Sequence, residues 1–200
     1  ALLWSLAGLN IKVIEWPAFA ITGGRSFIAF VMLTPLVMQI KNKHIDRYVI
    51  AGALFYAAFG YCYILSTKLT TSAMAVVMQY TAPIYVALLS WLFLGERVTK
   101  ADTVCMIFVF SGILLFFLDK FGGGSFWGNV LAIFNGVFFA GLVICFRLQK
   151  NAHPVMSIYL GNFISMLIGM KFVFQAGAPS FSSFIFLIVL GFQIAVTYSL

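Results

Sequence analysis

The stretch QYTAPIYVALLSWLFLGERVT, residues 79–99, places a proline inside a long apolar run that ends abruptly at Gly-Glu-Arg. It closes a segment of 27 uncharged residues between Lys68 and Glu96. A helix needs about 20 apolar residues to cross a bilayer. The stretch therefore predicts a membrane-spanning helix that is broken or bent at Pro83 and ends at the membrane surface.

The composition extends this prediction to the whole chain. Hydrophobic residues make up 63% of the sequence, aromatic residues 18% and charged residues only 8%, which leaves too little polar surface to cover a water-soluble globule. Only helices and closed barrels satisfy their backbone polar groups in lipid. Because the apolar runs are long and lack a two-residue alternation, we predict an all-α integral membrane protein, a multi-pass helical bundle surrounded by the lipid bilayer.

Eight apolar segments are candidate spans, and neither end of the chain resembles a natural terminus. The chain begins at Ala1 inside one apolar run and stops at Leu200 inside another, so we expect a fragment of a longer protein. The first run lacks the basic lead and the cleavage pattern of a signal peptide. The predicted spans are residues 1–15, 18–40, 47–66, 69–94, 102–119, 126–147, 154–174 and 181–200.

Basic residues are more numerous in every second connection between these spans. Cytoplasmic loops of membrane proteins carry an excess of Lys and Arg, so we predict a cell (plasma) membrane protein with a cytoplasmic N-terminus. The net charge of +7 is scattered over the loops without an organised face, which argues against nucleic acid as a partner. The even-numbered connections carry Lys41, Lys43, Arg47, Arg97, Lys100, Arg147 and Lys150, and the odd-numbered ones carry Lys12, Lys68, Lys120 and Lys171.

The sequence also contains an internal repeat. WPAFAITGGRSF (residues 16–27) is similar to HPVMSIYLGNFI (residues 153–164), and five identities share an offset of 137 residues. A unit of five helices is odd in number, so two tandem copies must be inverted in the membrane, as in many secondary transporters. We predict a first unit at residues 1–120, a Gly-rich joint at 121–125 and a partial second unit at 126–200. The identities pair Pro17 with Pro154, Ile21 with Ile158, Gly24 with Gly161, Phe55 with Phe192 and Tyr61 with Tyr198.

Four stretches carry a family resemblance: LLWSLAGLNIKV (residues 2–13), GGRSF in the second span, GYCYILSTKLTTSAMAVVMQYTAPIYVALLSWLFLGERVT (60–99) and SGILLFF (111–117). Together they resemble the EamA-type members of the drug/metabolite transporter superfamily. The resemblance implies a ten-helix carrier, of which eight helices are present, that moves amino acids, other metabolites or toxic compounds by alternating access. It implies a small-molecule substrate and no cofactor, and it allows a homodimer.

Polar residues and one proline within the spans are the candidates for a substrate pathway. For each of them, hydrogen bonding between helices or a place in an interfacial aromatic belt is the structural alternative. As a set, polar groups distributed over several spans would suit a shared pathway. The candidates are Trp4, Asn10, Arg25, Tyr61, Tyr63, Gln79, Tyr80, Pro83, Asn135, Gln193 and Tyr198.

Three of these positions leave a choice between a functional and a structural role. Arg25 suits an anchor for a carboxylate or a structural arginine that bonds helix-end carbonyls, and we favour the structural role. Pro83 suits a moving break or a static kink, and both stay open. Glu96 and Arg97 suit a gating ion pair with another cytoplasmic loop or a helix end that meets water, and we favour the helix end.

An intramembrane enzyme and a receptor-like bundle are the alternatives to a carrier. The chain contains no HExxH, GxSxG or paired Asp-rich motif, so we predict no catalytic residues. The cysteines and histidines lack metal-ligand spacing, and we predict no metal site. No carboxylate lies at the centre of a span, which favours facilitated diffusion or exchange over a carboxylate proton relay. A receptor-like bundle would not explain the inverted repeat.

Overall fold

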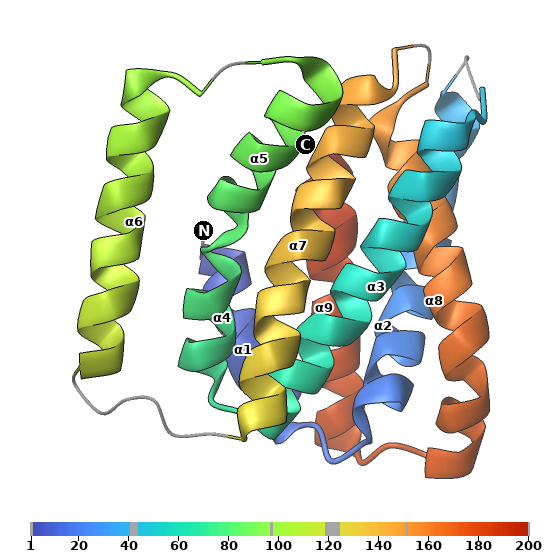
Figure 1. Cartoon of the computed structure of the whole chain (residues 1–200). Helices are drawn as coiled ribbons and strands as arrows, with labels where there is room; N and C mark the ends of the chain where they lie inside the picture. The colour runs from blue at the N-terminus through green and yellow to red at the C-terminus, as the bar shows by residue number, and fades with distance from the viewer. Residues whose placement is uncertain (1, 41–43, 97, 119–124, 151, 200) are drawn as a thin grey trace.

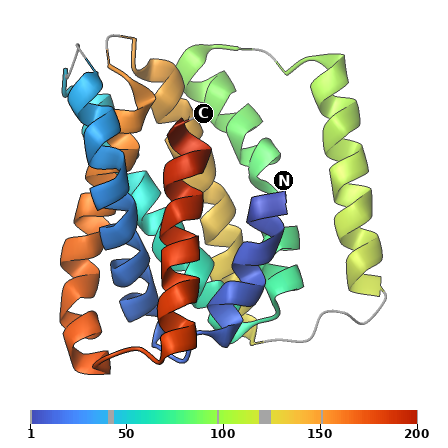
Figure 2. The same cartoon turned by 180° about the vertical axis from the view of Figure 1, so that it is seen from behind.

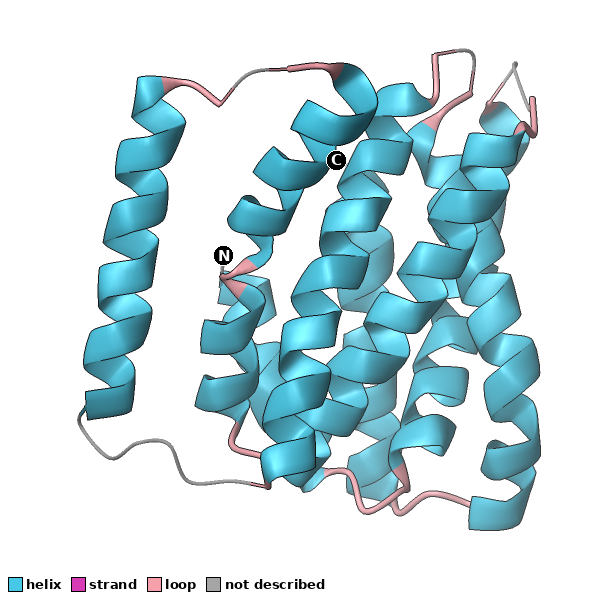
Figure 3. Ribbon diagram, viewed as in Figure 1, coloured by secondary structure: helices cyan, strands magenta, loops and turns pink. Residues whose placement is uncertain are grey.

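The computed structural model describes residues 2–40, 44–96, 98–118, 125–150 and 152–199, with side chains except at 2–6, 116–118 and 198–199. This part of the chain consists of α-helices joined by short connections (Figure 3). The prediction of an all-α bundle is therefore confirmed. The helices are α1 (Leu2–Val13), α2 (Ala18–Gln39), α3 (Arg47–Leu69), α4 (Ser72–Gln79), α5 (Ala82–Leu94), α6 (Lys100–Leu118), α7 (Phe126–Leu148), α8 (Pro154–Ala176) and α9 (Phe181–Ser199).

Each of the eight predicted spans contains helix, and among the described residues five helical segments are long and apolar enough to cross a membrane. These are α2, α3, the combined α4–α5 segment Ser72–Leu94, α7 and α8. With 12 residues, α1 extends for about 18 Å, less than the roughly 30 Å of a bilayer core. The apolar part of α9, Phe181–Thr197, is also shorter than these five segments. The predicted span at residues 69–94 is divided into α4 and α5.

The long helices alternate in direction across the bundle (Figure 1). α2, α5 and α7 end at the top of this view, where α3, α6 and α8 begin. We call this the upper end and the opposite one the lower end. Every second connection predicted from the sequence therefore lies at the same end. The Gly-rich joint at 121–125 falls outside the described residues except for Ser125.

The packing between helices is reciprocal about the crossing of α2 and α8. These two helices pack along one another in opposite directions. On one side α3 packs against α7 and α8, and on the other α9 packs against α1 and α2 (Figure 2). If α1, α2 and α3 correspond in order to α7, α8 and α9, each of these contacts has its counterpart.

The ends of two helices are determined by local side-chain and backbone chemistry. Asp46 precedes α3, and its Oδ1 atom accepts a hydrogen bond of 2.8 Å from the N–H of Val49, the bond expected of an N-cap. α5 ends at Gly95, whose φ of 69° lies in the left-handed region that favours glycine. The predicted helix end at Gly95 is therefore confirmed.

Two lysines join the lower ends of α1 and α3. Lys12, in the last turn of α1, donates a hydrogen bond of 2.6 Å to the carbonyl of Thr70 just after α3. Lys68, in the last turn of α3, donates to the carbonyl of Ile14 just after α1. Each cation thus lies against the electronegative end of the other helix, where positive charge is favourable.

α6 lies apart from the rest of the bundle (Figure 1). Its apolar side chains are largely exposed, including Phe108, Leu114 and Leu115. Exposed apolar side chains around a helix of this kind are compatible with a lipid environment.

Candidate functional site

The predicted break at Pro83 is present in the structure. α4 ends at Gln79 and α5 begins at Ala82, with Tyr80 and Thr81 forming a tight turn between them. Pro83 lies at the start of α5, where its missing N–H costs little because the first N–H groups of a helix have no intrahelical partner. In a continuous helix that N–H would bind the carbonyl of Gln79, so the break coincides with the proline.

Hydrogen bonds from Thr81 to a residue three positions earlier close the turn, where a continuous α-helix would bond four positions back. The Thr81 N–H donates to the carbonyl of Met78 over 3.1 Å, and the Thr81 hydroxyl donates to the same carbonyl over 2.6 Å. These bonds span three residues and give a tighter turn than an α-helix. Local polar groups therefore satisfy part of the backbone at the break.

A polar pair lies beside the break. Asn135 in α7 donates a hydrogen bond of 3.2 Å from Nδ2 to Oε1 of Gln79. Asn135 is fully buried, and its Oδ1 atom has no hydrogen-bond partner within the described part of the chain. Because an unsatisfied buried amide oxygen is costly, this atom is well suited to accept a hydrogen bond from a donor that enters the site.

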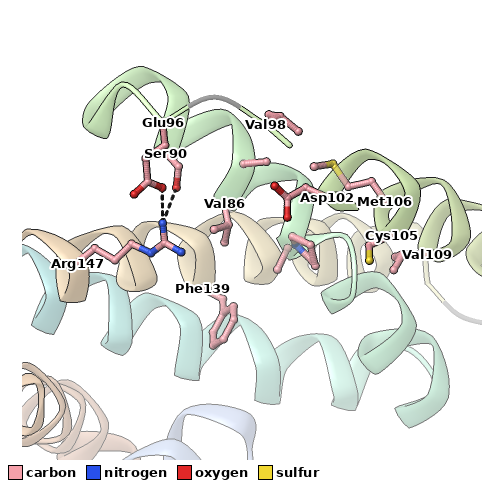
Figure 4. A pocket seen from close by; sticks show the side chains of 13 residues that line it. Val86, Ser90, Glu96, Val98, Asp102, Cys105, Met106, Val109, Phe139 and Arg147 are labelled. Atoms are coloured by element: carbon pink, nitrogen blue, oxygen red, sulfur yellow. Dashed lines mark hydrogen bonds and ion pairs between the residues drawn. The ribbon is translucent and has the colours of Figure 1, made fainter. Parts of the chain in front are cut away.

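A cavity of ≈ 410 Å³ extends from the break toward the upper end between α5, α6 and α7 (Figure 4). Its walls are mainly apolar and include Val86 of α5, Met106 of α6 and Phe139 of α7. Pro83 also lines it, so the predicted proline is part of a cavity wall. A largely apolar cavity with a few polar groups is the usual form of a small-molecule site.

An ion pair lies at the upper end of this cavity (Figure 4). The Arg147 Nη1 atom, at the end of α7, lies 2.5 Å from Oε2 of Glu96 and donates a longer bond of 3.4 Å to Oγ of Ser90. Ser90 belongs to α5, and Glu96 follows Gly95 at the end of this helix. Glu96 therefore pairs with Arg147, which the sequence assigns to another connection at the same end and the structure places in the last turn of α7. Arg97 falls outside the described residues.

Arg25 and Tyr61 lie at a different place, where α2, α3 and α8 meet. Arg25 is buried, and its Nη2 atom is 3.5 Å from the carbonyl of Gly60. The Tyr61 hydroxyl donates to the carbonyl of Ser165 over 2.8 Å. Contacts to backbone carbonyls across helices support the structural role that we favour for Arg25.

The other predicted residues are divided between core and surface. Tyr63 and Gln193 are buried, Asn10 is half-buried and Tyr80 is exposed. Trp4 lies in α1 and Tyr198 in α9, but their side chains fall outside the described residues. Of the eleven candidates, the structure thus brings Gln79 and Asn135 into direct contact and places Pro83 beside them.

The sequence did not predict the contacts of Arg147 with Ser90 and Glu96. It placed Ser90 in an apolar run and Arg147 in a loop. It also missed a buried group at the upper end. Gln149 donates to Ser157 Oγ over 2.6 Å and to the Tyr48 carbonyl over 3.1 Å, which joins α7, α8 and α3. Tyr48 is 101 residues from Gln149, and Ser157 is on the next helix, so no local pattern indicates the contacts. Among the described residues, no group of three or more His, Cys, Asp or Glu is placed to hold a metal ion.

Comparison with known proteins identifies the family. Residues 1–118 match the model of the EamA-like transporter family. The chain is 26% identical over 160 residues to an uncharacterized transporter in the sor 3′ region of Acidianus ambivalens, covering 78% of this chain and 59% of the relative. It is 26% identical over 182 residues to the uncharacterized transporter YetK of Bacillus subtilis, covering 88% and 53%. An uncharacterized transporter of Archaeoglobus fulgidus is 27% identical over 169 residues, covering 84% and 60%.

The chain thus spans between 53% and 60% of the length of these curated relatives. The matched region covers residues 1–118 of the first predicted unit at 1–120, including the broken α4–α5 span. This match confirms the resemblance found in the sequence. The chain therefore belongs to the EamA-like transporter family.

Proposed function

We propose that this chain acts in a secondary carrier that moves small polar metabolites across a cell membrane by alternating access. The observation that carries the proposal is the break at Tyr80 and Thr81, where the buried Asn135 bonds to the half-buried Gln79, four residues before Pro83 in the cavity wall. Discontinuous helices with polar groups at membrane depth form the substrate sites of many transporters. The Oδ1 atom of Asn135 is the acceptor that we assign to the solute.

The arrangement of the helices supports two further parts of this proposal. The reciprocal packing about α2 and α8 suits two inverted units, at residues 1–120 and 126–200, joined by 121–125. The upper end, where the connections richer in Lys and Arg lie, is assigned to the cytoplasm together with the N-terminal side of the chain. A carrier that binds its solute between two inverted units needs no catalytic residues.

Transport in liposomes by purified full-length protein that contains this chain tests the function. Liposomes loaded with one unlabelled solute, from a panel of amino acids and other small metabolites, should accumulate that solute in labelled form by counterflow. Replacement of Asn135 by Ala should reduce the initial rate by about five- to thirtyfold, because a lost hydrogen bond in a buried site corresponds to roughly 1–2 kcal/mol. Replacement of the exposed Gln175 by Ala is the matched control and should leave the rate unchanged.

Two results would count against the proposal. Counterflow of no solute from a broad panel, by liposomes that contain folded protein, would contradict a carrier function. Equal rates for the Asn135 and Gln175 variants would leave a carrier whose pathway lies elsewhere. The orientation is tested separately with Lys150→Cys, which a membrane-impermeant maleimide should label in inside-out vesicles and not in intact cells.

A further inference from the structure

The charges in the wall of the cavity between α5, α6 and α7 do not balance. Among the described residues that line it, the charged side chains are those of Glu96, Asp102 and Arg147. Two carboxylates and one guanidinium leave one negative charge. Lys100, two residues before Asp102, is exposed outside the wall. The charge of the wall therefore attracts a positively charged solute.

The guanidinium of this wall is already neutralised. Nη1 of Arg147 lies 2.5 Å from Oε2 of Glu96 and donates to Oγ of Ser90 over 3.4 Å. Figure 4 shows Arg147 turned toward these two residues. Opposite charges at so short a distance largely cancel each other's field. An anionic solute would thus meet a guanidinium whose charge Glu96 balances.

The carboxylate of Asp102 is hydrogen-bonded but not neutralised. Its Oδ2 atom accepts bonds from the N–H of Thr99 over 2.9 Å and from the Thr99 hydroxyl over 2.7 Å. Both donors are uncharged, and the bonds are those of a helix start. Within the described part of the chain, Arg147 and Glu96 form the one ion pair. Asp102 thus lines the cavity with a negative charge that no described cation pairs.

The apolar part of the wall fits the body of a small solute. Val86, Met106 and Phe139 line a cavity of ≈ 410 Å³, within the usual size range of a small-molecule site. An aromatic ring such as that of Phe139 also attracts a cation to its face. The Oδ1 atom of Asn135, which we assign to the solute at the break, is an acceptor and suits an N–H donor.

We infer that the solute of this cavity is an amine with an apolar body, bound as its ammonium ion with Asp102 as the counter-ion. The apolar body lies among Val86, Met106 and Phe139, while Arg147 stays with Glu96. Asp102 is then a specificity-determining residue. This inference rests on the proposed carrier function for the role of the cavity, but binding does not require that the solute be moved.

Three probes with the same phenethyl body test the charge preference of the site. Full-length protein that contains this chain, in detergent micelles, is dialysed against labelled phenethylammonium, hydrocinnamate or phenethyl alcohol, with empty micelles as the blank. Phenethylammonium should bind more tightly than the neutral alcohol, and hydrocinnamate more weakly. A salt concentration of about 1 M should reduce these differences, because salt screens exposed charges. Equal affinity for the three probes, or a preference for hydrocinnamate, would overturn the inference.

Variants of the wall should change the affinity for the ammonium probe in opposite directions. Asp102→Asn removes the charge but keeps an oxygen for both bonds from Thr99, so the start of α6 is retained. It should weaken phenethylammonium binding about two- to fivefold, the size expected of an exposed charge pair, and Glu96→Gln should act alike. Arg147→Gln leaves two carboxylates and should strengthen this binding by a similar factor. The matched control is Glu15→Gln, which removes an exposed carboxylate after α1.

The neutral probe separates these effects from a loss of the fold. Phenethyl alcohol should bind all four variants as it binds the parent protein, because it carries no charge. Retained binding of the alcohol together with unchanged binding of phenethylammonium in Asp102→Asn would overturn the role of Asp102.

A variant that fills the cavity locates the probes. Ala87→Phe adds a ring to the cavity wall and should abolish the binding of all three probes. Leu88→Phe changes an exposed residue of α5 outside this wall and should leave binding unchanged. Equal binding by the two variants would place the probes elsewhere and overturn the inference.

Binding and transport are measured separately. Preferential binding of phenethylammonium by a protein that moves no solute would support this site and contradict the carrier. Counterflow of other solutes by a protein that does not prefer the ammonium probe would support the carrier and contradict this inference.

Discussion

Gly23 of α2 and Gly169 of α8 lie in backbone contact at the crossing of the two central helices. A Cβ atom added to Gly23 would be 2.8 Å from the Cα atom of Gly169, closer than two carbon atoms that are not bonded can come. Small residues at such crossings let membrane helices approach and gain packing contacts. Because α3 and α9 pack against these same helices, this contact positions much of the bundle.

Gly169→Ala should therefore destabilise the chain. We expect a loss of about 1–3 kcal/mol, typical of an overpacked contact, measured as unfolding in mixed micelles with increasing SDS and followed by far-UV circular dichroism. Gly112→Ala is the matched control, because an added Cβ on Gly112 in α6 meets nothing within 4 Å. The control should be neutral or stabilising by up to about 1 kcal/mol. Equal unfolding of the two variants would contradict the role of the crossing.

Pro83→Ala should slow transport with little change in stability. The variant supplies the N–H that the Gln79 carbonyl lacks and so favours a continuous helix across the break. Because Pro83 lies at the start of α5, the free energy of unfolding should change by less than about 1 kcal/mol. Counterflow rate and SDS unfolding measure the two effects.

Pro35 provides the control for this substitution. It lies inside α2, away from the cavity, so Pro35→Ala removes a helix-interior proline without touching the break. This variant should be as stable as the parent chain or more stable, and it should transport at the parent rate. A static kink at Pro83 would instead be indicated by two variants with the same transport rate.

Gln79 and Asn135 should behave as a coupled pair in stability. Asn135→Leu alone leaves the Gln79 amide without its partner and should cost about 1–3 kcal/mol. The double variant with Gln79→Leu should cost less than the sum of the single variants, since both polar groups are then removed. A double-mutant cycle measured by SDS unfolding gives the coupling, for which membrane hydrogen bonds average about 0.6 kcal/mol. Additive single variants would show that the contact is not energetically significant.

Asp46→Ala should destabilise the start of α3. The substitution removes the 2.8 Å bond to the N–H of Val49, and the loss of an N-cap typically costs about 1 kcal/mol. Asp46→Asn keeps an oxygen acceptor and should cost much less. Hydrogen exchange at Val49 and the following amides distinguishes this local effect from a general loss of stability. Equal protection in both variants would contradict the capping role.

The candidate site could be predicted in part from the sequence. Pro83 marked the break because a proline removes a helical hydrogen bond wherever it lies, and Gln79 and Asn135 were noticeable as polar residues in apolar spans. The contact between these two amides could not be predicted, because they are 56 residues apart. The pair of Glu96 and Arg147, separated by 51 residues, was hidden for the same reason.

The sequence by itself determined the kind of protein: an apolar composition requires a lipid environment, and lipid forces the backbone into helices whose lengths and ends can be read from charges, glycine and proline. Tertiary structure alone decided which helices meet, because apolar faces are nearly interchangeable and lipid contacts are as favourable as contacts with another apolar helix. Close backbone approach at Gly23 and Gly169, and the few polar pairs, select one arrangement. Pro83 therefore marks a break in the sequence, while only the packing of α5 against α7 turns that break into the wall of a cavity that Glu96 and Arg147 also line.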